Sequence, residues 1–126
     1  MDENEISKII VDATIEVHRT LGGPGLLESV YQEAEAWELL KRGLEVEREK
    51  VIPIIYKGHE LGLPLRLDLL VNGKVIVECK ATVNYNTIFE VQTLTYLRLT
   101  GLKLGIVLNF GEKLVKNGIH RVVNGL

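Results

Sequence analysis

The chain has 126 residues, a length suited to a single domain, here residues 1–126, with a substantial core. The net charge of −2 argues against a broadly basic surface, so recognition of nucleic acid would have to rest on local geometry. The single cysteine, Cys79, excludes an internal disulfide and a cysteine-based zinc cluster. The sequence shows no signal peptide and no apolar run long enough to span a membrane, so we expect a cytoplasmic protein without membrane association.

The first third of the chain predicts two helices. Apolar residues recur at helical spacing from Ile6 to Leu21, and the glycine-rich stretch from Gly22 to Gly25 ends that pattern. A second helix is expected from Leu26 to Arg42, with Gly43 ending it. We expect one side of this second helix to face the core, formed by Leu27, Val30, Tyr31, Ala34, Trp37 and Leu40.

The rest of the chain predicts a sheet interrupted by one helix. Two apolar strands flank Asn72-Gly73 within the stretch from Leu65 to Ala81, and Pro53 favours a sheet edge or a bulge. The other strands are expected at Leu44 to Tyr56, His59 to Leu63, Leu104 to Phe110 and Ile119 to Val123. A helix is expected from Ile88 to Leu99, with an apolar side formed by Ile88, Val91, Leu94, Thr95 and Leu99.

Three charged residues lie on the two central apolar strands: Asp68 on the first, and Glu78 and Lys80 at the end of the second. Charges are costly among buried strands unless they are paired or bind a metal. Alternation along a strand places Glu78 and Lys80 on one face and Cys79 on the other. Two carboxylates suit Mg²⁺, which takes one or two of them and keeps several waters. The alternative is that these are surface charges at strand ends.

The register of the two strands separates these alternatives. If Asn72-Gly73 were a two-residue hairpin loop, Asp68 would face Val77, and the Asp68 and Glu78 carboxylates would point to opposite faces. A metal site needs an offset of one residue, supplied by a longer loop or a bulge, and bulges are common beside active sites. We therefore predict such an offset between Asp68 and Glu78.

Asp68, Glu78 and Lys80 resemble the acid…Glu-x-Lys signature of the PD-(D/E)xK nuclease superfamily, although Leu67 stands in place of the leading proline. The run Gly25-x-x-Glu28-x-x-Tyr31 resembles the GxxExxY protein family, a branch of that superfamily. The other matching segments are Val17-His18-Arg19 and the end of the chain from Arg121 to Leu126. The resemblance implies an α/β fold with a mixed sheet. Its restriction-endonuclease-like core would be αβββαβ, with an extra N-terminal helix and a C-terminal strand.

The resemblance also implies roles for individual residues. The catalytic set would be Glu28, Asp68, Glu78, Lys80 and Gln92. The metal ligands would be Asp68, Glu78 and the backbone carbonyl of Cys79, with Glu28 as an additional ligand. Residues that contact substrate or support the site would be Tyr31, Tyr96 and His18.

The residues taken without the resemblance have simpler interpretations. Glu28 would be a carboxylate favoured by the dipole at a helix N-terminus. His18 would be a capping or core histidine, and Tyr31 a core tyrosine with a hydrated hydroxyl. Gln92 would face solvent.

The leading hypothesis is a metal-dependent nuclease or nuclease-like phosphodiesterase that uses Mg²⁺ or Mn²⁺ and acts on nucleic acid. The alternative is a catalytically silent module on the same fold that binds nucleic acid or another protein, since a fold alone does not confer activity. A third hypothesis is a homodimer or other homo-oligomer, paired through the apolar edges at Ile52 to Tyr56 and Ile119 to Val123.

Overall fold

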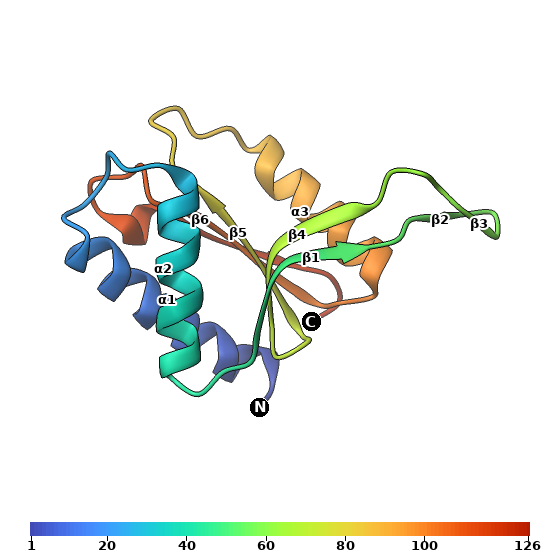
Figure 1. The fold of residues 1–126 in the computed structure, drawn as a ribbon, viewed down its shortest axis with the longest axis horizontal. Helices are drawn as coiled ribbons and strands as arrows, with labels where there is room; N and C mark the ends of the chain where they lie inside the picture. The colour runs from blue at the N-terminus through green and yellow to red at the C-terminus, as the bar shows by residue number, and fades with distance from the viewer.

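The fold is a five-stranded sheet with helices on both faces (Figure 1), seen in a computed structural model that describes all 126 residues. The order of strands across the sheet is β1-β4-β5-β6-β7. The elements are α1 (Glu3–Thr20), α2 (Glu28–Lys41), β1 (Val46–Ile52), β2 (Ile55–Tyr56), β3 (His59–Glu60), β4 (Leu65–Val71), β5 (Val75–Lys80), α3 (Ile88–Thr100), β6 (Leu104–Asn109), the short 3-10 helix η1 (Val115–Gly118) and β7 (Ile119–Val123).

Only β5 and β6 are parallel, and the helix α3 connects them; all other neighbouring strands are antiparallel. Parallel neighbours need a crossover, and α3 supplies it. The expected αβββαβ core is confirmed as α2-β1-β4-β5-α3-β6, with α1 before it and β7 after it. The strands β2 and β3 form a separate small hairpin that projects from the far end of β1 and β4 (Figure 1). Pro53 directly follows the edge strand β1, as the sequence predicts.

Two apolar clusters cover the two faces of the sheet. On one face, Ile10 of α1 and Leu39 of α2 pack with Val77 of β5, and all three are fully buried. On the other face, Leu97 of α3 packs with Ile76 of β5. The strand β5 is thus covered on both sides, which explains why its sequence is apolar almost throughout.

The predicted inner side of α2 is wrong for most of its members. Leu27, Val30, Trp37 and Leu40 are exposed, and only Tyr31 of the predicted set is fully buried. The side that contacts the sheet is formed by Tyr31, Gln32, Glu35, Ala36 and Leu39. Apolar periodicity misidentified this side because two of its buried positions hold polar residues that are hydrogen-bonded to other parts of the chain.

The predicted apolar side of α3 is also wrong for most of its members, since Ile88, Val91 and Leu99 are exposed. Leu94 of the predicted set does pack against the core. The buried residues of α3 are Thr93 and Leu97. The reason is close packing: a Cβ added to Gly105 of β6 would lie 2.5 Å from the Thr93 methyl group. A small residue on each side lets α3 approach the sheet, so a threonine occupies the contact position that apolar periodicity would assign to a larger residue.

Candidate functional site

The hairpin between β4 and β5 has a three-residue loop, Asn72–Lys74, because Val71 pairs with Val75. Continuing this register places Asp68 opposite Glu78, on the same face of the hairpin. The predicted offset is therefore confirmed, and it comes from the longer loop.

The pairing of β4 with β5 ends just before the two acids, and their side chains bridge the strands instead. The Asp68 N–H donates to Glu78 Oε2 at 2.9 Å, and the Cys79 N–H donates to Asp68 Oδ2 at 2.9 Å. The other oxygen of each carboxylate makes no hydrogen bond within the protein. The two strands thus separate at this point, and the carboxylates occupy the opening between them.

The strand β4 is distorted at Asp68. Leu67 packs in the cluster under α3, whereas Leu69 packs in the cluster under α1 and α2, although residues two apart share a face in a regular strand. The neighbouring strand β1 pairs with β4 on either side of Glu49 but not at Glu49 itself. Glu49 has a φ of 50°, a left-handed conformation that is unfavourable for a residue with a side chain.

Lys80 points to the α3 side of the sheet, and its Nζ lies 4.6 Å from the centre of the Phe89 ring. Cys79 is fully buried in the opposite cluster, so the predicted alternation along β5 is confirmed. In a strand the N–H and C=O of one residue point to the same side. Since the Cys79 N–H donates to Asp68, the Cys79 carbonyl also points towards the opening.

The electrostatics of the opening favour a positive charge. Burial, followed by the neighbouring Asp68 carboxylate, raises the pKa of Glu78 to about 8. Burial also raises the pKa of Asp68, while the Cys79 N–H and the Lys80 ammonium lower it. Two adjacent carboxylates, buried at Glu78 and half-buried at Asp68, with one lysine nearby form a donor set of the kind that suits a hard divalent cation.

Glu28 is the first residue of α2 and comes close to this group. Loss of hydration raises the pKa of Glu28; Lys80 lowers it and Asp68 raises it. No three His, Cys, Asp or Glu side chains lie close enough together to hold a metal ion jointly. The donor set therefore fits an ion held by Asp68 and Glu78 that keeps several waters, as Mg²⁺ does, rather than a closed cage of side chains.

The loop before Glu28 is fixed by Tyr31. The Tyr31 hydroxyl donates to the Gly23 carbonyl at 2.6 Å and accepts from the Leu26 N–H at 3.1 Å. Gly23 has a φ of 98°, which favours glycine, and the Tyr31 ring stacks on Phe110 at 4.7 Å. Tyr31 thus holds the turn that leads into α2, whose first residue is Glu28.

The two candidate residues on α3 differ in their surroundings. Burial, followed by Glu78 and Asp68, raises the pKa of Tyr96, so the Tyr96 side chain lies near the two carboxylates. Gln92 is exposed and makes no hydrogen bond within the protein. The structure thus places Tyr96 near enough to the two acids to be affected by their charges, whereas the Gln92 side chain faces solvent.

His18 lies in the core. It is buried at the end of α1, with Nε2 2.8 Å from the Glu112 carbonyl, and its ring stacks against Phe110. These contacts attach the segment around η1 to α1, which agrees with the simpler interpretation of a core histidine.

Gln32 is a site neighbour that the sequence analysis missed. It is buried on α2, and its Nε2 donates to Glu49 Oε1 at 2.9 Å and, at 3.5 Å, to the Asp68 carbonyl. Gln32 follows Glu28 by four residues, and this spacing is the signal that could have identified it. Glu49 gives no comparable signal, because only the register places it beside Asp68.

Asn109 was also missed. It ends β6 beside Lys80, and its amide group clamps Thr82 by accepting from the Thr82 N–H and donating to the Thr82 carbonyl, both at 3.0 Å. A Cβ on the nearby Gly111 would lie 2.3 Å from the Thr82 carbonyl oxygen, so this approach needs glycine. A buried asparagine at the carboxyl end of a parallel strand is the sequence signal for this clamp.

Comparison with known proteins identifies a family for nearly the whole chain. A family model described as the PD-(D/E)XK nuclease superfamily matches residues 4–122. Neither the curated proteins nor the solved structures contain a match. No helix has the length and apolar character needed to cross a membrane. With a mixed sheet between helices and the acidic opening at β4 and β5 within the matched range, the chain belongs to the PD-(D/E)XK nuclease superfamily.

Proposed function

We propose that this protein is a metal-dependent phosphodiester hydrolase that cuts nucleic acid, in the GxxExxY branch of the superfamily. The observation that carries the proposal is the opening between β4 and β5, where the Asp68 and Glu78 carboxylates meet and Lys80 follows on the same strand. Membership of a nuclease superfamily supports nucleic acid as the substrate.

Asp68 and Glu78 would hold Mg²⁺ or Mn²⁺ through the oxygens that make no hydrogen bond within the protein. The Cys79 carbonyl points to the same opening and would be a further ligand. Glu28 feels the charges of Lys80 and Asp68 but does not converge with the two acids on one point, so it would bind one of the waters of the ion. A bound ion of this kind polarises a phosphoryl oxygen and lowers the pKa of a coordinated water.

Lys80 would position the attacking water and stabilise the negative charge that develops on the phosphoryl group. Its Nζ lies over the Phe89 ring, and its positive charge lowers the pKa of Glu78. Tyr96 and Gln92 on α3 would contact the substrate or a bound water. Removing one preorganised group of this kind typically lowers kcat by about 10²–10³-fold.

The alternative function is a catalytically silent module that binds nucleic acid or a protein. Two observations favour it: the net charge is −2, and no three acidic, histidine or cysteine side chains converge on one point. A silent module has no need to bind a divalent ion, so ion binding and cleavage together discriminate between the two.

The first experiment is calorimetric titration of Mn²⁺ and Mg²⁺ into the wild type, Asp68→Asn and Glu78→Gln. Both variants keep an oxygen that can accept the backbone N–H. Glu60→Gln removes an exposed carboxylate on β3 and is the matched control. We expect binding in the wild type and the control and its loss in both site variants. Absence of ion binding in folded wild type would overturn the proposed metal site.

The second experiment incubates the same proteins with single- and double-stranded DNA and RNA. We expect metal-dependent cleavage by the wild type, and its loss in Lys80→Met, which keeps an apolar stem against Phe89. Lys57→Met, in the turn between β2 and β3, is the matched control. Ion binding without cleavage of any of these substrates would favour the silent module.

A further inference from the structure

A basic pocket lies between the end of α1 and the loop that follows β6. Its volume is about 500 Å³, which is within the range of small-ligand sites. The charged side chains that line it are Arg19 of α1 and Lys113 and Lys116 of the loop, and no acidic residue lines it. In a chain with a net charge of −2, three cations around one hollow without an acid favour an anionic ligand.

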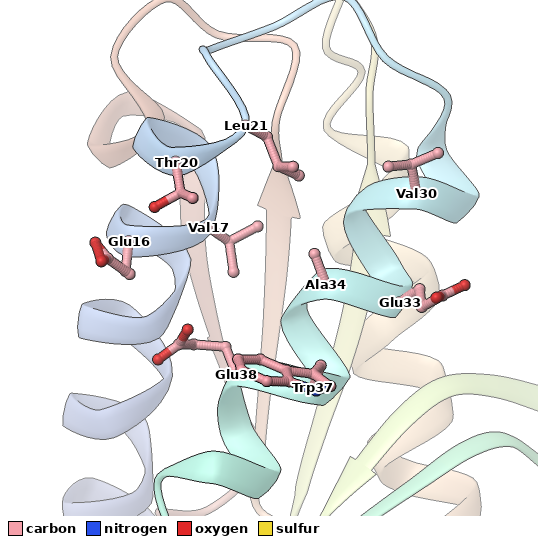
Figure 2. A pocket seen from close by; sticks show the side chains of 9 residues that line it. All are labelled: Glu16, Val17, Thr20, Leu21, Val30, Glu33, Ala34, Trp37 and Glu38. Atoms are coloured by element: carbon pink, nitrogen blue, oxygen red, sulfur yellow. The ribbon is translucent and has the colours of Figure 1, made fainter.

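The other large hollow carries the opposite charge. The groove between α1 and α2 has a volume of about 520 Å³ (Figure 2). Its charged lining residues are Glu16, Glu33 and Glu38, and no lysine or arginine lines it. The helix α1 thus borders an acidic groove on one side and the basic pocket on the other, so the positive charge of this region is concentrated in the pocket.

The loop that carries the two lysines is held against α1. The buried His18 ring borders the pocket, and its Nε2 lies 2.8 Å from the Glu112 carbonyl, just before the lysines. Val115, between the lysines, packs in the core. A Cβ added to Gly118 would lie 2.3 Å from a backbone oxygen of β6, so the loop also lies close against the sheet. These contacts form the pocket before any ligand arrives.

The cations of the pocket are available to an external anion. Lys113 and Lys116 are exposed and form no ion pair within the protein. Arg19 pairs with Glu16, but this pair is exposed and is therefore weak in water. The nearby Glu112 side chain faces Gly118, since its Cγ would lie 3.1 Å from a Cβ placed there, and it does not line the pocket.

The pocket and the acidic opening lie at the same end of the sheet (Figure 1). The parallel strands β5 and β6 end side by side at Lys80, so the loop after β6 starts beside the opening and leads to the pocket. Gly23 lines the pocket and precedes Glu28 by five residues, so these two residues lie at most about 18 Å apart. One strand of DNA carries a phosphate about every 3.4 Å along the helix axis. The pocket is thus within about five nucleotides of Glu28.

We propose that the basic pocket binds a backbone phosphate of the nucleic acid, up to about five nucleotides from the bond that the opening would cleave. The proposal rests on the proposed function for the identity of the strand, but binding in the pocket does not require cleavage. Arg19 offers the planar donor group that fits phosphate oxygens, and Lys113 and Lys116 offer point charges. A phosphate contact carries no base information, so the pocket contributes affinity and not sequence preference.

The first test measures binding by fluorescence anisotropy, in EDTA so that no metal-dependent cleavage occurs. The probes are labelled DNA and RNA strands of about 24 nucleotides and the matching DNA duplex. The pocket variant combines Lys113→Gln and Lys116→Gln. The matched control combines Lys74→Gln and Lys103→Gln, which removes the same charge from exposed positions before β5 and β6, at the opposite end of the sheet.

We expect the pocket variant to bind about tenfold more weakly than the wild type, and the slope of log affinity against log salt to fall by about 1. The control should stay within about threefold of the wild type. Arg19→Gln, on α1, should weaken binding in the same direction and tests the pocket independently of the loop. Equal affinities of the pocket variant and the control, or a wild type that binds none of the three probes, would overturn the proposal.

Calorimetric titration of inorganic phosphate identifies the source of the phosphate group. A nucleic-acid strand adds contacts outside the pocket, so we expect the wild type to bind the strand more tightly than inorganic phosphate. Loss of inorganic phosphate binding in the pocket variant, with unchanged strand binding, would mean that the ligand is a free phosphate. That result would overturn the proposal.

Cleavage kinetics separate a failure of the pocket from a failure of the proposed function. We expect KM for the strand to rise about tenfold in the pocket variant with little change in kcat, because the contact lies away from the reacting phosphate. Metal-dependent cleavage with the same KM in the pocket variant and the control would overturn the pocket proposal alone. Strand binding that depends on Lys113 and Lys116, without cleavage of any probe, would support the pocket and overturn the proposed function.

Discussion

The hairpin β4–β5 and the helix α2 both mix apolar and charged residues, but they place them in opposite ways. In the hairpin the apolar residues are buried, and the charges lie where the two strands separate, at Asp68 and Glu78. In α2 the buried side includes Gln32 and Glu35, while Val30, Trp37 and Leu40 are exposed. The difference shows that burial follows hydrophobicity in a strand covered on both faces, but not in a helix that borders a polar opening.

The polar residues of α2 are tolerated because most of their groups find partners. Gln32 donates to Glu49, and Glu35 Oε2 accepts from the Thr14 hydroxyl at 2.9 Å. The exception is Glu35 Oε1, which is buried without a hydrogen bond. An unsatisfied buried oxygen is costly when charged, so burial keeps Glu35 protonated and raises its pKa to about 8.

The largest expected effect on the free energy of unfolding is at Leu39. Its neighbour Leu40, on the other side of α2, provides the comparison. Leu39 is fully buried and Leu40 is 54% exposed. We expect Leu39→Ala to lower the free energy of unfolding by about 2–5 kcal/mol, because it leaves a cavity in the core. Leu40→Ala should change it by less than about 0.5 kcal/mol. Urea unfolding measures both, and equal losses would contradict the orientation of α2.

The next effect is the dependence of stability on pH through Glu35. The folded state keeps this carboxyl protonated up to about pH 8, whereas the unfolded chain releases the proton near pH 4.5. The folded state binds more protons between these values, so stability falls as pH rises, by about 1.4 kcal/mol per pH unit. We expect a loss of about 3 kcal/mol from this group between pH 5.5 and 7.5.

Glu35→Gln isolates this effect, because the amide has no charge to bury and can still accept from Thr14. The other groups that act on Glu35 are Glu38 and Arg42 of α2, and the Cys79 thiol lies across the same core. Urea unfolding at the two pH values should show a smaller decrease in the variant than in the wild type. The same decrease in both proteins would mean that Glu35 ionises without penalty.

The sequence predicts the strands and the register of the acids because these follow from local rules. The apolar runs on either side of Asn72-Gly73 define β4 and β5, and the requirement that Asp68 meet Glu78 predicts the longer loop. The distortion at Glu49 could not be predicted, since a left-handed glutamate is imposed by contacts with Gln32 on α2 and with the neighbouring strand. The prediction of which side of a helix is buried fails for a similar reason, because contacts with other parts of the chain decide it.

A smaller effect on stability is expected from Gln32, whose hydrogen bonds join α2 to β1 and β4. Gln32→Ala removes the hydrogen bonds to Glu49 Oε1 and the Asp68 carbonyl. We expect a loss of about 0.5–1.5 kcal/mol in the free energy of unfolding, the usual net contribution of such a hydrogen bond, since the exposed Glu49 carboxylate can be hydrated in the variant. Thermal unfolding would detect the change, and Gln32→Glu, which keeps the size but cannot donate when ionised, should be at least as destabilising. An unchanged stability in both variants would mean that Glu49 holds its conformation without α2.

The smallest effect on stability is expected at Gln92, which is exposed on α3 and makes no hydrogen bond. Gln92→Ala should leave the free energy of unfolding within about 0.5 kcal/mol of wild type. If Gln92 serves the proposed hydrolysis, kcat should fall with little change in ion binding, because the amide would act on substrate or water and not on the metal ligands. Thr95→Ala, one turn along and also exposed, is the matched control. Equal cleavage by both variants would remove Gln92 from the proposed catalytic set while leaving the acids and Lys80 untouched, since their placement rests on the hairpin and not on the outer side of α3.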